Sequence, residues 1–251
     1  MDKSLKIFAD YHTHTLYSHG RGTIEDNVIE ARRKGLKEIA ITDHGPGHFM
    51  YGVTRKSLAG MREEVDRLNE KYPDIRVLLG VEANIISLGG GLDVDGPVLS
   101  VLDILLVGFH FGALPATLKD GYNIHIKNFA GRWTNKMKES IREANTRALI
   151  RAMDMYPVRI ITHPGAKADI DTKTLARAAA VKNVALEINS SHGHMTVDYV
   201  KRAKGEGAKF VLGSDAHKPG RVGDVKAAVW VARQAGLTAS DIINAVKEGG
   251  K

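Results

Sequence analysis

The chain has 251 residues, with 36 Lys and Arg against 29 Asp and Glu, 11 His and no Cys. A composition of 43% hydrophobic and 26% charged residues is typical of a globular domain and excludes a disordered or fibrous chain. Without Cys the chain forms no disulfides, thiolate zinc sites, iron–sulfur clusters or cysteine nucleophiles. Any metal must therefore bind to nitrogen and oxygen ligands.

The sequence shows no targeting signal. The first residues, MDKSLKIFADYH, have neither the apolar core nor the small-residue cleavage site of a secretory signal. The most apolar stretch, Val98 to Phe111, is too short to span a bilayer and contains Asp103. We therefore expect a cytoplasmic protein without a membrane segment.

Short β-branched runs alternate with longer amphipathic segments, a pattern typical of a mostly parallel sheet covered by helices. Seven runs predict strands, namely Ile7–Tyr11, Glu38–Thr42, Arg76–Val81, Ile104–Phe109, Arg159–Thr162, Val184–Ile188 and Lys209–Leu212. Helices are predicted from Thr23 to Gly35, over Lys56–Lys71, Lys136–Tyr156, Thr172–Lys182, Val197–Lys204 and Asp224–Gln234, and for a last helix that begins at Thr238-Ala239-Ser240-Asp241. No linker divides the series, so residues 1–251 are expected to form one domain of the TIM-barrel type.

Every predicted strand ends in residues that can bind a metal ion. In chain order these are His12 and His14, with His19 shortly after, then Asp43 and His44, Glu82, His110, His163, Glu187 and Asn189, and Asp215 and His217. Ligand sites in parallel α/β folds form beyond the carboxyl ends of the strands, so closing a barrel would bring these residues to one rim. A single His in such a place is more often a cap or a hydrogen-bonded core residue. Of the 11 His in the chain, seven lie at or just after strand ends, and this number favours a metal centre instead.

Two of these pairs share a spacing that suits joint binding. His12 and His14 are two residues apart and point to one face of a strand, and Asp215 and His217 repeat the spacing on the last strand. Imidazole and carboxylate ligands suit Zn, Mn or Fe.

The ordered motifs resemble the PHP family, named for polymerase and histidinol phosphatase domains. They are His12-x-His14-Thr15, Thr42-Asp43-His44-Gly45, Glu82-Ala83-Asn84, Gly108-Phe109-His110, His163-Pro164-Gly165 and Ser214-Asp215-Ala216-His217. The match runs from about residue 8 to residue 223. It is most similar to the stand-alone bacterial phosphatase branch, including Glu187-Ile188-Asn189-Ser190-Ser191 and Pro219-Gly220-Arg221-Val222-Gly223.

The resemblance implies a distorted seven-stranded (β/α) barrel that holds three divalent metal ions. Under this interpretation the first ion binds His12, His14, Glu82 and Asp215. Glu82 also bridges to a second ion on His110 and His163, and a third ion binds His19, His44 and His217. The implied activity is a metal-dependent phosphoesterase with Glu82, Asp215 and His217 as catalytic residues.

The expected reaction is hydrolysis of small phosphomonoesters by metal-activated water. We expect a water between the first two ions, under Glu82, to attack phosphorus while the third ion neutralises the non-bridging oxygens. No protein nucleophile is required. The proton for the leaving oxygen could come from a metal-bound water, from His192 or from His194.

Most of the formal charge of +7 lies in residues 119–151, which hold eight Lys and Arg against three acids. This is the longest connection in the chain, and its first half is expected to overhang the barrel mouth. Candidates to grip a phosphate or stack on an aromatic group are Tyr122, Asn123, His125, Lys127, Arg132 and Trp133. We predict substrate contacts for Lys127, Arg132 and His48. For Lys127 and Arg132 the alternative is that they belong to a basic helix face exposed to solvent. For Arg142, Arg147 and Arg151 the solvent-exposed helix face is the preferred interpretation.

Other functions remain open at this point. Nuclease or 3′-end processing activity is the main alternative, because PHP domains also accompany DNA polymerases and the basic segment could follow a nucleic-acid backbone. The chain has no strip of interleaved aromatic and basic residues of the kind that binds single strands. A non-catalytic metal-binding module would show gaps in the ligand set, and the sequence shows none. Amidohydrolase chemistry is a fourth possibility.

Overall fold

Seven parallel strands form the centre of the computed structural model, which describes residues 5–130 and 135–247. Each strand pairs with the next one along the chain, in the order β2-β3-β4-β5-β6-β7-β8. Their bounds are β2 Ala9–Asp10, β3 Glu38–Ile41, β4 Arg76–Asn84, β5 Ile104–Gly108, β6 Ile160–Ile161, β7 Ala185–Asn189 and β8 Lys209–Gly213. The carboxyl ends of all seven strands therefore lie at one end of the sheet.

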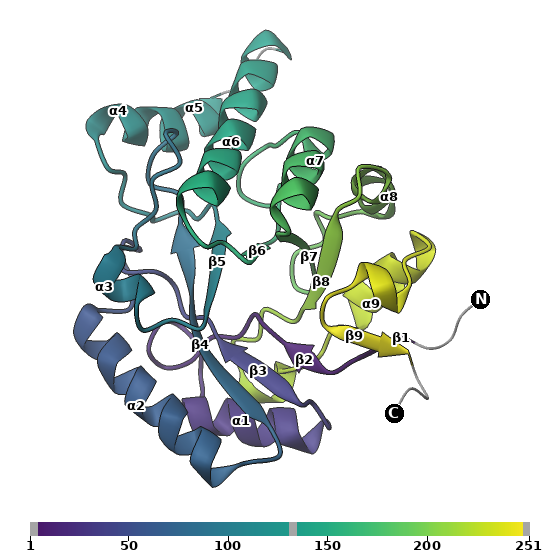
Figure 1. Ribbon diagram of the computed structural model, residues 1–251. Helices are drawn as coiled ribbons and strands as arrows, with labels where there is room; N and C mark the ends of the chain where they lie inside the picture. The colour runs from purple at the N-terminus through teal and green to yellow at the C-terminus, as the bar shows by residue number, and fades with distance from the viewer. Residues whose placement is uncertain (1–4, 131–134, 248–251) are drawn as a thin grey trace.

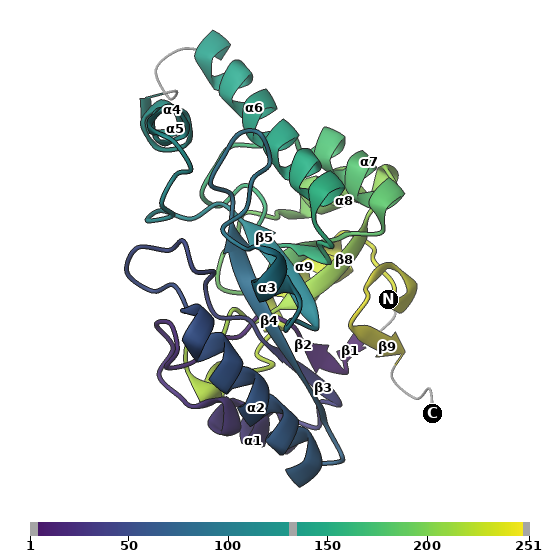
Figure 2. The ribbon, with the colours of Figure 1, turned by 60° about the vertical axis from the view of Figure 1, so that its left-hand side comes forward.

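Helices surround this sheet in Figures 1 and 2. The longer ones are α1 Ile24–Arg33, α2 Arg55–Lys71, α6 Asn135–Met155, α7 Thr172–Lys182, α8 Val197–Gly205 and α9 Lys226–Gln234. Shorter turns are α3 Gly96–Leu99, α4 Leu118–Gly121, the π-helix η1 Tyr122–Ile126, α5 Lys127–Ala130, and the 3₁₀ turns η2 Pro219–Arg221 and η3 Ala239–Asp241. A separate antiparallel pair, β1 Leu5–Ile7 with β9 Ala245–Lys247, joins the two ends of the chain.

The sheet closes into a barrel through a short seam between β2 and β8. On the carboxyl side, Thr13 and Ala216 form a single parallel bridge, with the His14 amide donating to the Ala216 carbonyl at 2.8 Å. On the amino side, the buried Asn244 amide donates to the carbonyls of Ala9 (2.9 Å) and Leu212 (2.8 Å). The Asn244 side chain thus replaces part of a strand ladder at this seam.

The barrel interior changes from apolar to polar along the strands. A buried apolar cluster takes residues from all seven strands: Ala9, Tyr11, Ala40, Leu78, Ile104, Leu106, Ile160, Ala185 and Val211. Because successive inward side chains are two residues apart, Leu106 is followed on the inside by Gly108 and His110, and Val211 by Gly213 and Asp215.

Glycine separates the apolar layer from the polar rim for a steric reason. A Cβ at Gly213 would overlap the Glu187 carboxylate, and a Cβ at Gly108 would overlap the Thr162 hydroxyl and come within 3.3 Å of the His163 ring. The glycines therefore leave room for the polar side chains that lie above them.

The predicted barrel is confirmed, while two local predictions are wrong. The last helix, expected from Thr238, is one 3₁₀ turn followed by β9. The first predicted strand, Ile7–Tyr11, is divided between β1, which pairs outside the barrel, and β2, which pairs inside it. The connection after β5 contains α4, η1 and α5, which the sequence pattern did not predict.

Within the described residues, no helix is long and apolar enough to cross a membrane.

Candidate metal centre

Glu82 lies at the centre of a cluster of buried polar side chains at the carboxyl ends of the strands. Its Oε1 is 2.9 Å from His163 Nε2 and 3.0 Å from His110 Nε2, and its Oε2 is 3.1 Å from His44 Nδ1. The same Oε1 is 3.4 Å from His12 Nε2. The glutamate is 1% exposed, so a fully buried carboxylate meets imidazoles from four different strand ends.

The first predicted ligand group has the spacing of donors around one ion. His12 Nε2 is 3.3 Å from His14 Nε2, and His14 Nε2 is 3.3 Å from Asp215 Oδ1. His12 Nε2 is 3.4 Å from Glu82 Oε1 and 3.7 Å from Asp215 Oδ1. Ligands at about 2.0–2.1 Å from a tetrahedral ion lie about 3.3 Å from one another. The donors of these four residues therefore match a single cation.

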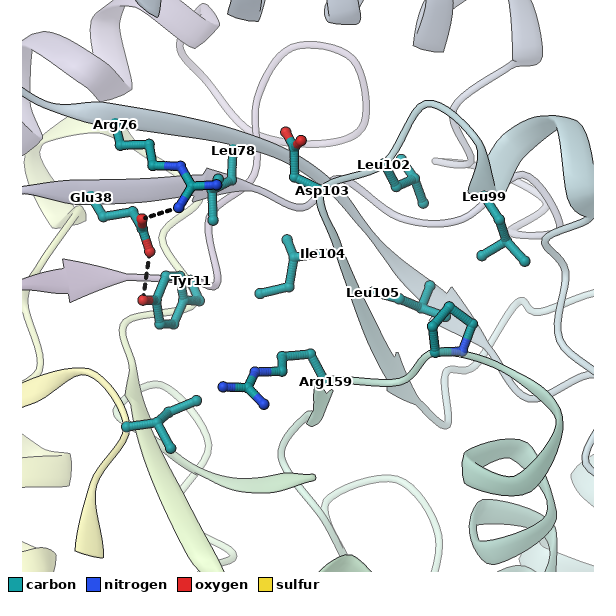
Figure 3. Close-up of a pocket in the computed structure, with 12 residues that line it drawn as sticks. Tyr11, Glu38, Arg76, Leu78, Leu99, Leu102, Asp103, Ile104, Leu105 and Arg159 are labelled. Carbon is teal, nitrogen blue, oxygen red and sulfur yellow. Dashed lines mark hydrogen bonds and ion pairs between the residues drawn. The ribbon is translucent and has the colours of Figure 1, made fainter. Parts of the chain in front are cut away.

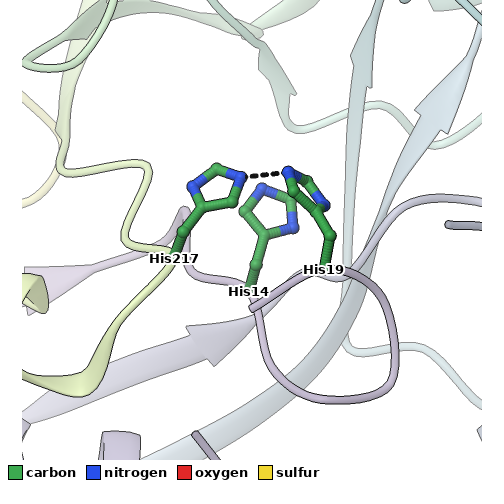
Figure 4. A group of neighbouring side chains, drawn as sticks. All are labelled: His14, His19 and His217. Atoms are coloured by element: carbon green, nitrogen blue, oxygen red, sulfur yellow. Dashed lines mark hydrogen bonds between the residues drawn. The ribbon is translucent and has the colours of Figure 1, made fainter. Parts of the chain in front are cut away.

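A third set of imidazoles lies beside this group, at the mouth. His217 Nε2 and His19 Nε2 are 2.5 Å apart, and Figure 4 shows both rings beside His14. Donor atoms of His14, His19 and His217 lie within 4.8 Å of one another. His44 stacks on His19 with ring centroids 4.9 Å apart, while its Nδ1 faces Glu82. The rings predicted for a third ion are thus adjacent, with His14 close enough to join them.

Several of these donor atoms are buried without a hydrogen bond. Among the described residues, Oε1 of Glu82 and the Nδ1 atoms of His14, His19 and His44 have no hydrogen-bond partner. Leaving a buried polar atom unpaired costs about 1–3 kcal/mol, so native proteins rarely tolerate several together. Unpaired nitrogen and oxygen donors that converge on one another fit a centre built for cations.

A second layer of side chains fixes the orientation of the imidazoles. Glu187 Oε1 is 2.8 Å from His12 Nδ1, and its Oε2 accepts a hydrogen bond from the His163 amide at 2.7 Å. Asn84 Oδ1 is 2.8 Å from His110 Nδ1. The contacts to His12 and His110 occupy Nδ1 and leave Nε2 directed at Glu82, the arrangement that second-layer partners produce around metal ligands.

The loop that carries His19 is held by Asp43. The Asp43 carboxylate accepts bonds from the Thr15 amide (2.7 Å), the Thr15 hydroxyl (2.5 Å) and the Ser18 hydroxyl (2.5 Å). Burial raises the pKa of Asp43, while the bonds from Ser18 and Thr15 favour its charged form. Asp43 is thus a structural anchor for the loop that leads from His14 to His19.

Three of the imidazoles have protonation states that suit metal binding, whereas at His12 and His163 burial is outweighed by the neighbouring carboxylates, which raise the pKa. Burial alone would raise the pKa of Glu82, but the neighbouring imidazoles of His110 and His12 hold it well below its usual value. Burial lowers the pKa of His14 to about 3 and that of His110 to about 4. Burial and the neighbouring imidazoles lower the pKa of His19 to about 4. At neutral pH the carboxylate is charged and these three imidazoles are neutral, as metal ligands must be.

Two residues of the cluster have a left-handed backbone. His163 has φ 26° and Asp215 has φ 53°, and each lies two residues beyond the end of a barrel strand. Such conformations cost non-glycine residues about 1–3 kcal/mol and occur most often at functional sites. The strain turns both side chains toward the cluster.

The cluster opens into a cavity of about 160 Å³. Besides the residues of the cluster, its walls include His48, Tyr51, Phe111, Lys167 and His192. His48 is buried, stacks on His44 with centroids 4.8 Å apart, and accepts a bond from the Tyr51 amide. His192 Nε2 is 3.4 Å from Asp215 Oδ2. His48, which the sequence suggested for substrate contact, therefore lies at the cavity.

The structure does not bring all of the other candidates to this cavity. Lys127 is exposed on α5, with Nζ 5.5 Å from the Tyr122 ring centroid. His125 donates to the Ala113 carbonyl at 2.9 Å and ties η1 to the loop after β5. His194 lines a neighbouring cleft. Arg132 and Trp133 lie outside the described residues.

Sequence reasoning missed two residues that the geometry makes important. Lys167 lines the cavity from the loop after β6, although it was not among the cationic candidates. Glu187 was noted only as a strand-end residue, whereas it positions His12. The signal that predicted the ligands also applies to these two residues, because both lie at or beyond the carboxyl end of a strand.

Comparison with known proteins gives close relatives over most of the chain. A "Probable phosphatase" from Shewanella frigidimarina is 34% identical over 255 residues, covering 96% of this chain and 90% of that protein. A "Probable phosphatase" from Yersinia enterocolitica is 34% identical over 223 residues, covering 83% of this chain and 78% of that protein.

Solved structures of similar fold include the histidinol phosphate phosphatase of Lactococcus lactis, complexed with zinc, L-histidinol and phosphate. It has a TM-score of 0.59 and 17% identity, and the match covers 92% of this chain and 94% of that one. The model of the PHP domain matches residues 10–233, which include every residue of the cluster. The chain therefore belongs to the PHP domain family.

Proposed function

We propose that the cluster binds three divalent metal ions and hydrolyses small phosphomonoesters. The observation that carries this proposal is the position of Glu82, a buried carboxylate whose two oxygens lie 2.9–3.4 Å from nitrogens of four histidines. A carboxylate in this position can bridge two cations.

The chain is a phosphatase by family and by its relatives. The L. lactis protein, which shares the fold, was crystallised with zinc and phosphate. Nitrogen and oxygen donors accept several divalent ions, so we propose zinc first, with manganese or iron as alternatives.

We assign the ligands as the family resemblance implies. His12, His14, Glu82 and Asp215 would hold the first ion, and Glu82, His110 and His163 the second. His19, His44 and His217 would hold the third. Donor spacings of 2.9–3.7 Å within the first two groups suit shared ions, although His163 also groups with His12 and Glu82, and His44 with His14 and Glu82.

Divalent ions held here would supply Lewis acidity, which activates a water molecule and neutralises charge on the phosphoryl oxygens. The chain itself orients the ligands through Glu187 and Asn84 and encloses the phosphoryl group in the cavity. Lys167 adds a positive charge at the wall. His192 faces the cavity, so it is better placed than His194 to hold a proton for the leaving oxygen.

The proposal is tested by metal analysis of the purified protein combined with a substrate panel. The panel contains p-nitrophenyl phosphate, histidinol phosphate and a single-stranded oligonucleotide. We expect about three ions per chain and phosphate release from the small esters without cleavage of the oligonucleotide. Oligonucleotide cleavage without turnover of small esters would establish the nuclease alternative instead.

A further inference from the structure

A second cleft lies beside the metal cavity, on the same rim of the barrel. Its volume is about 430 Å³, within the range of about 300–1,000 Å³ typical of small-molecule sites. The loops after β6 and β7 form part of its wall, together with residues near the amino ends of α6, α7 and α8. No residue of the proposed ligand set lines it.

Two loops separate this cleft from the metal cavity and contribute to both. In the loop after β6, His163 faces the metal cavity, Pro164 lines the cleft and Lys167 lines both spaces. In the loop after β7, His192 lines the metal cavity and His194 lines the cleft. A molecule with one end at the ligand cluster would therefore reach the cleft by passing Lys167.

The sizes of the two spaces suggest what each one holds. The metal cavity, at about 160 Å³, suits a phosphoryl group but not a bulky alcohol. The alcohol half of a larger ester must extend out of that cavity, and the adjoining cleft offers more than twice the volume.

Part of the lining of the cleft is apolar or aromatic. Ile141 of α6 and Ile170 of the loop after β6 line it, and Tyr199 of α8 presents a ring that is 41% exposed. These side chains suit a flat or apolar body, because an exposed aromatic ring offers a surface for stacking.

The charged groups of the cleft favour a negative ligand. Lys138 and Lys167 contribute two positive charges. Among the described residues that line the cleft, Asp169 is the one acid, and its Oδ2 is held by Arg142 through Nε and Nη2, both at 3.1 Å. The carboxylate is therefore compensated, and the two lysines leave the cleft net positive.

We propose that this cleft selects phosphomonoesters whose alcohol half carries an apolar or aromatic body and a second anionic group. The inference rests on the proposed function, since it places the reacting phosphate at the ligand cluster. It excludes alcohols with an amine in this position as preferred substrates, because the amine would face Lys138 and Lys167.

Three matched esters test this selection: 4-carboxyphenyl, 4-carbamoylphenyl and 4-(aminomethyl)phenyl phosphate. They share the ring and the reacting group and differ in the charge at the far end. We expect kcat/KM with the metal-loaded protein to fall in that order, by about tenfold from the carboxylate to the amine. The ratio should shrink at high salt because the contacts are partly exposed.

Lys138→Gln and Lys136→Gln provide the matched variants. Both lysines are exposed on α6, but Lys136 is two residues away, on another face, and does not line the cleft. Lys138→Gln should reduce the carboxylate-to-amine ratio to about threefold and change kcat/KM for the neutral carbamoyl ester less than for either charged ester, whereas Lys136→Gln should not alter the ratio.

The outcomes separate this inference from the proposed function. Equal kcat/KM for all three esters, or an unchanged ratio in Lys138→Gln, would overturn the assignment of the cleft while the phosphatase activity stands. No turnover of any ester or of p-nitrophenyl phosphate by the metal-loaded protein would overturn the proposed function itself.

Discussion

Both ends of the barrel hold cavities with charged side chains, but among the described residues the potential metal ligands converge at the carboxyl end. The cavity at the amino end is the larger, at about 380 Å³ against about 160 Å³ at the metal cluster. Figure 3 shows the amino-end cavity with Tyr11, Glu38, Arg76 and Asp103 among its lining residues. Volume alone therefore does not separate the two ends, because a cleft of about 430 Å³ lies at the carboxyl end beside the smaller metal cavity.

The polar groups at the amino end are paired. Tyr11 donates to Glu38 Oε1 at 2.6 Å, and Arg76 Nη1 lies 3.4 Å from Glu38 Oε2. Asp103 accepts bonds from Arg62 (2.7 Å) and from the Leu79 amide (2.8 Å). These contacts tie neighbouring strands together, which is a contribution to stability.

At the carboxyl end the donor atoms converge and several are unpaired. Glu82 Oε1 and Nδ1 of His14, His19 and His44 are buried without hydrogen bonds among the described residues. Cations bound among these atoms would remove the energetic cost of leaving them unpaired. The comparison shows that unsatisfied, converging donors identify the functional end better than cavity size does.

Removing the metal should produce the largest difference between the two ends. After dialysis against a chelator we expect activity to fall by more than about 10³-fold and to return when zinc or manganese is added. The metal-free protein should also melt at a lower temperature, since ions bound at a thousand times Kd stabilise the fold by about 4 kcal/mol. Full turnover by protein with less than one ion per ten chains would contradict the metal centre.

Exchanging a carboxylate for an amide at each end sharpens the comparison. Glu82→Gln should lower kcat/KM by about 10²–10³-fold and reduce the metal content, because the amide cannot bridge two ions as a carboxylate does. The measurements are elemental analysis and kinetics with p-nitrophenyl phosphate.

Glu38→Gln is the matched control at the amino end. It removes a carboxylate that contacts Tyr11 and Arg76 and should leave metal content and kcat/KM within twofold of the original protein. If both substitutions reduced activity equally, the division of roles between the two ends would be wrong.

A smaller effect is expected from Glu187→Gln, which changes the residue that positions His12. The glutamine can still meet His12 Nδ1 and accept from the His163 amide, so the fold should persist. Loss of the negative charge should lower metal affinity or activity by about 10–100-fold. Added metal should restore part of the activity, which would separate positioning from a direct catalytic role.

The arrangement of the metal centre could be predicted because each strand is a short buried run followed directly by a polar residue. Because barrel closure brings the carboxyl ends of the strands to one rim, His12, Glu82 and Asp215 lie together although they are far apart in the sequence. The last residue of β8 is Gly213 because a Cβ there would overlap the Glu187 carboxylate, which lies beside it.

The errors arose where tertiary contacts override a local signal. Thr238 and Asp241 form the capping box that predicted a helix, but the chain leaves the turn to insert Asn244 into the barrel seam. Charge counting favoured Lys127 because it lies in a basic segment; the structure places it on an exposed turn, and its contact with substrate stays a prediction. Lys167 reaches the cavity from a short loop with no unusual composition.

Of these substitutions, Tyr11→Phe should have the smallest effect, and it should change the stability of the fold without changing kcat/KM. The phenol is buried beside Glu38, and this burial raises its pKa, so at neutral pH it is protonated and donates to the carboxylate. Phenylalanine keeps the ring in the apolar layer of the barrel and removes the bond, which should lower the free energy of unfolding by about 1 kcal/mol. Urea denaturation measures this change, while kcat/KM should stay within twofold. A tenfold loss of activity without loss of stability would show that a residue at the amino end affects catalysis at the carboxyl end. The assignment of stability to one end and catalysis to the other would then be wrong.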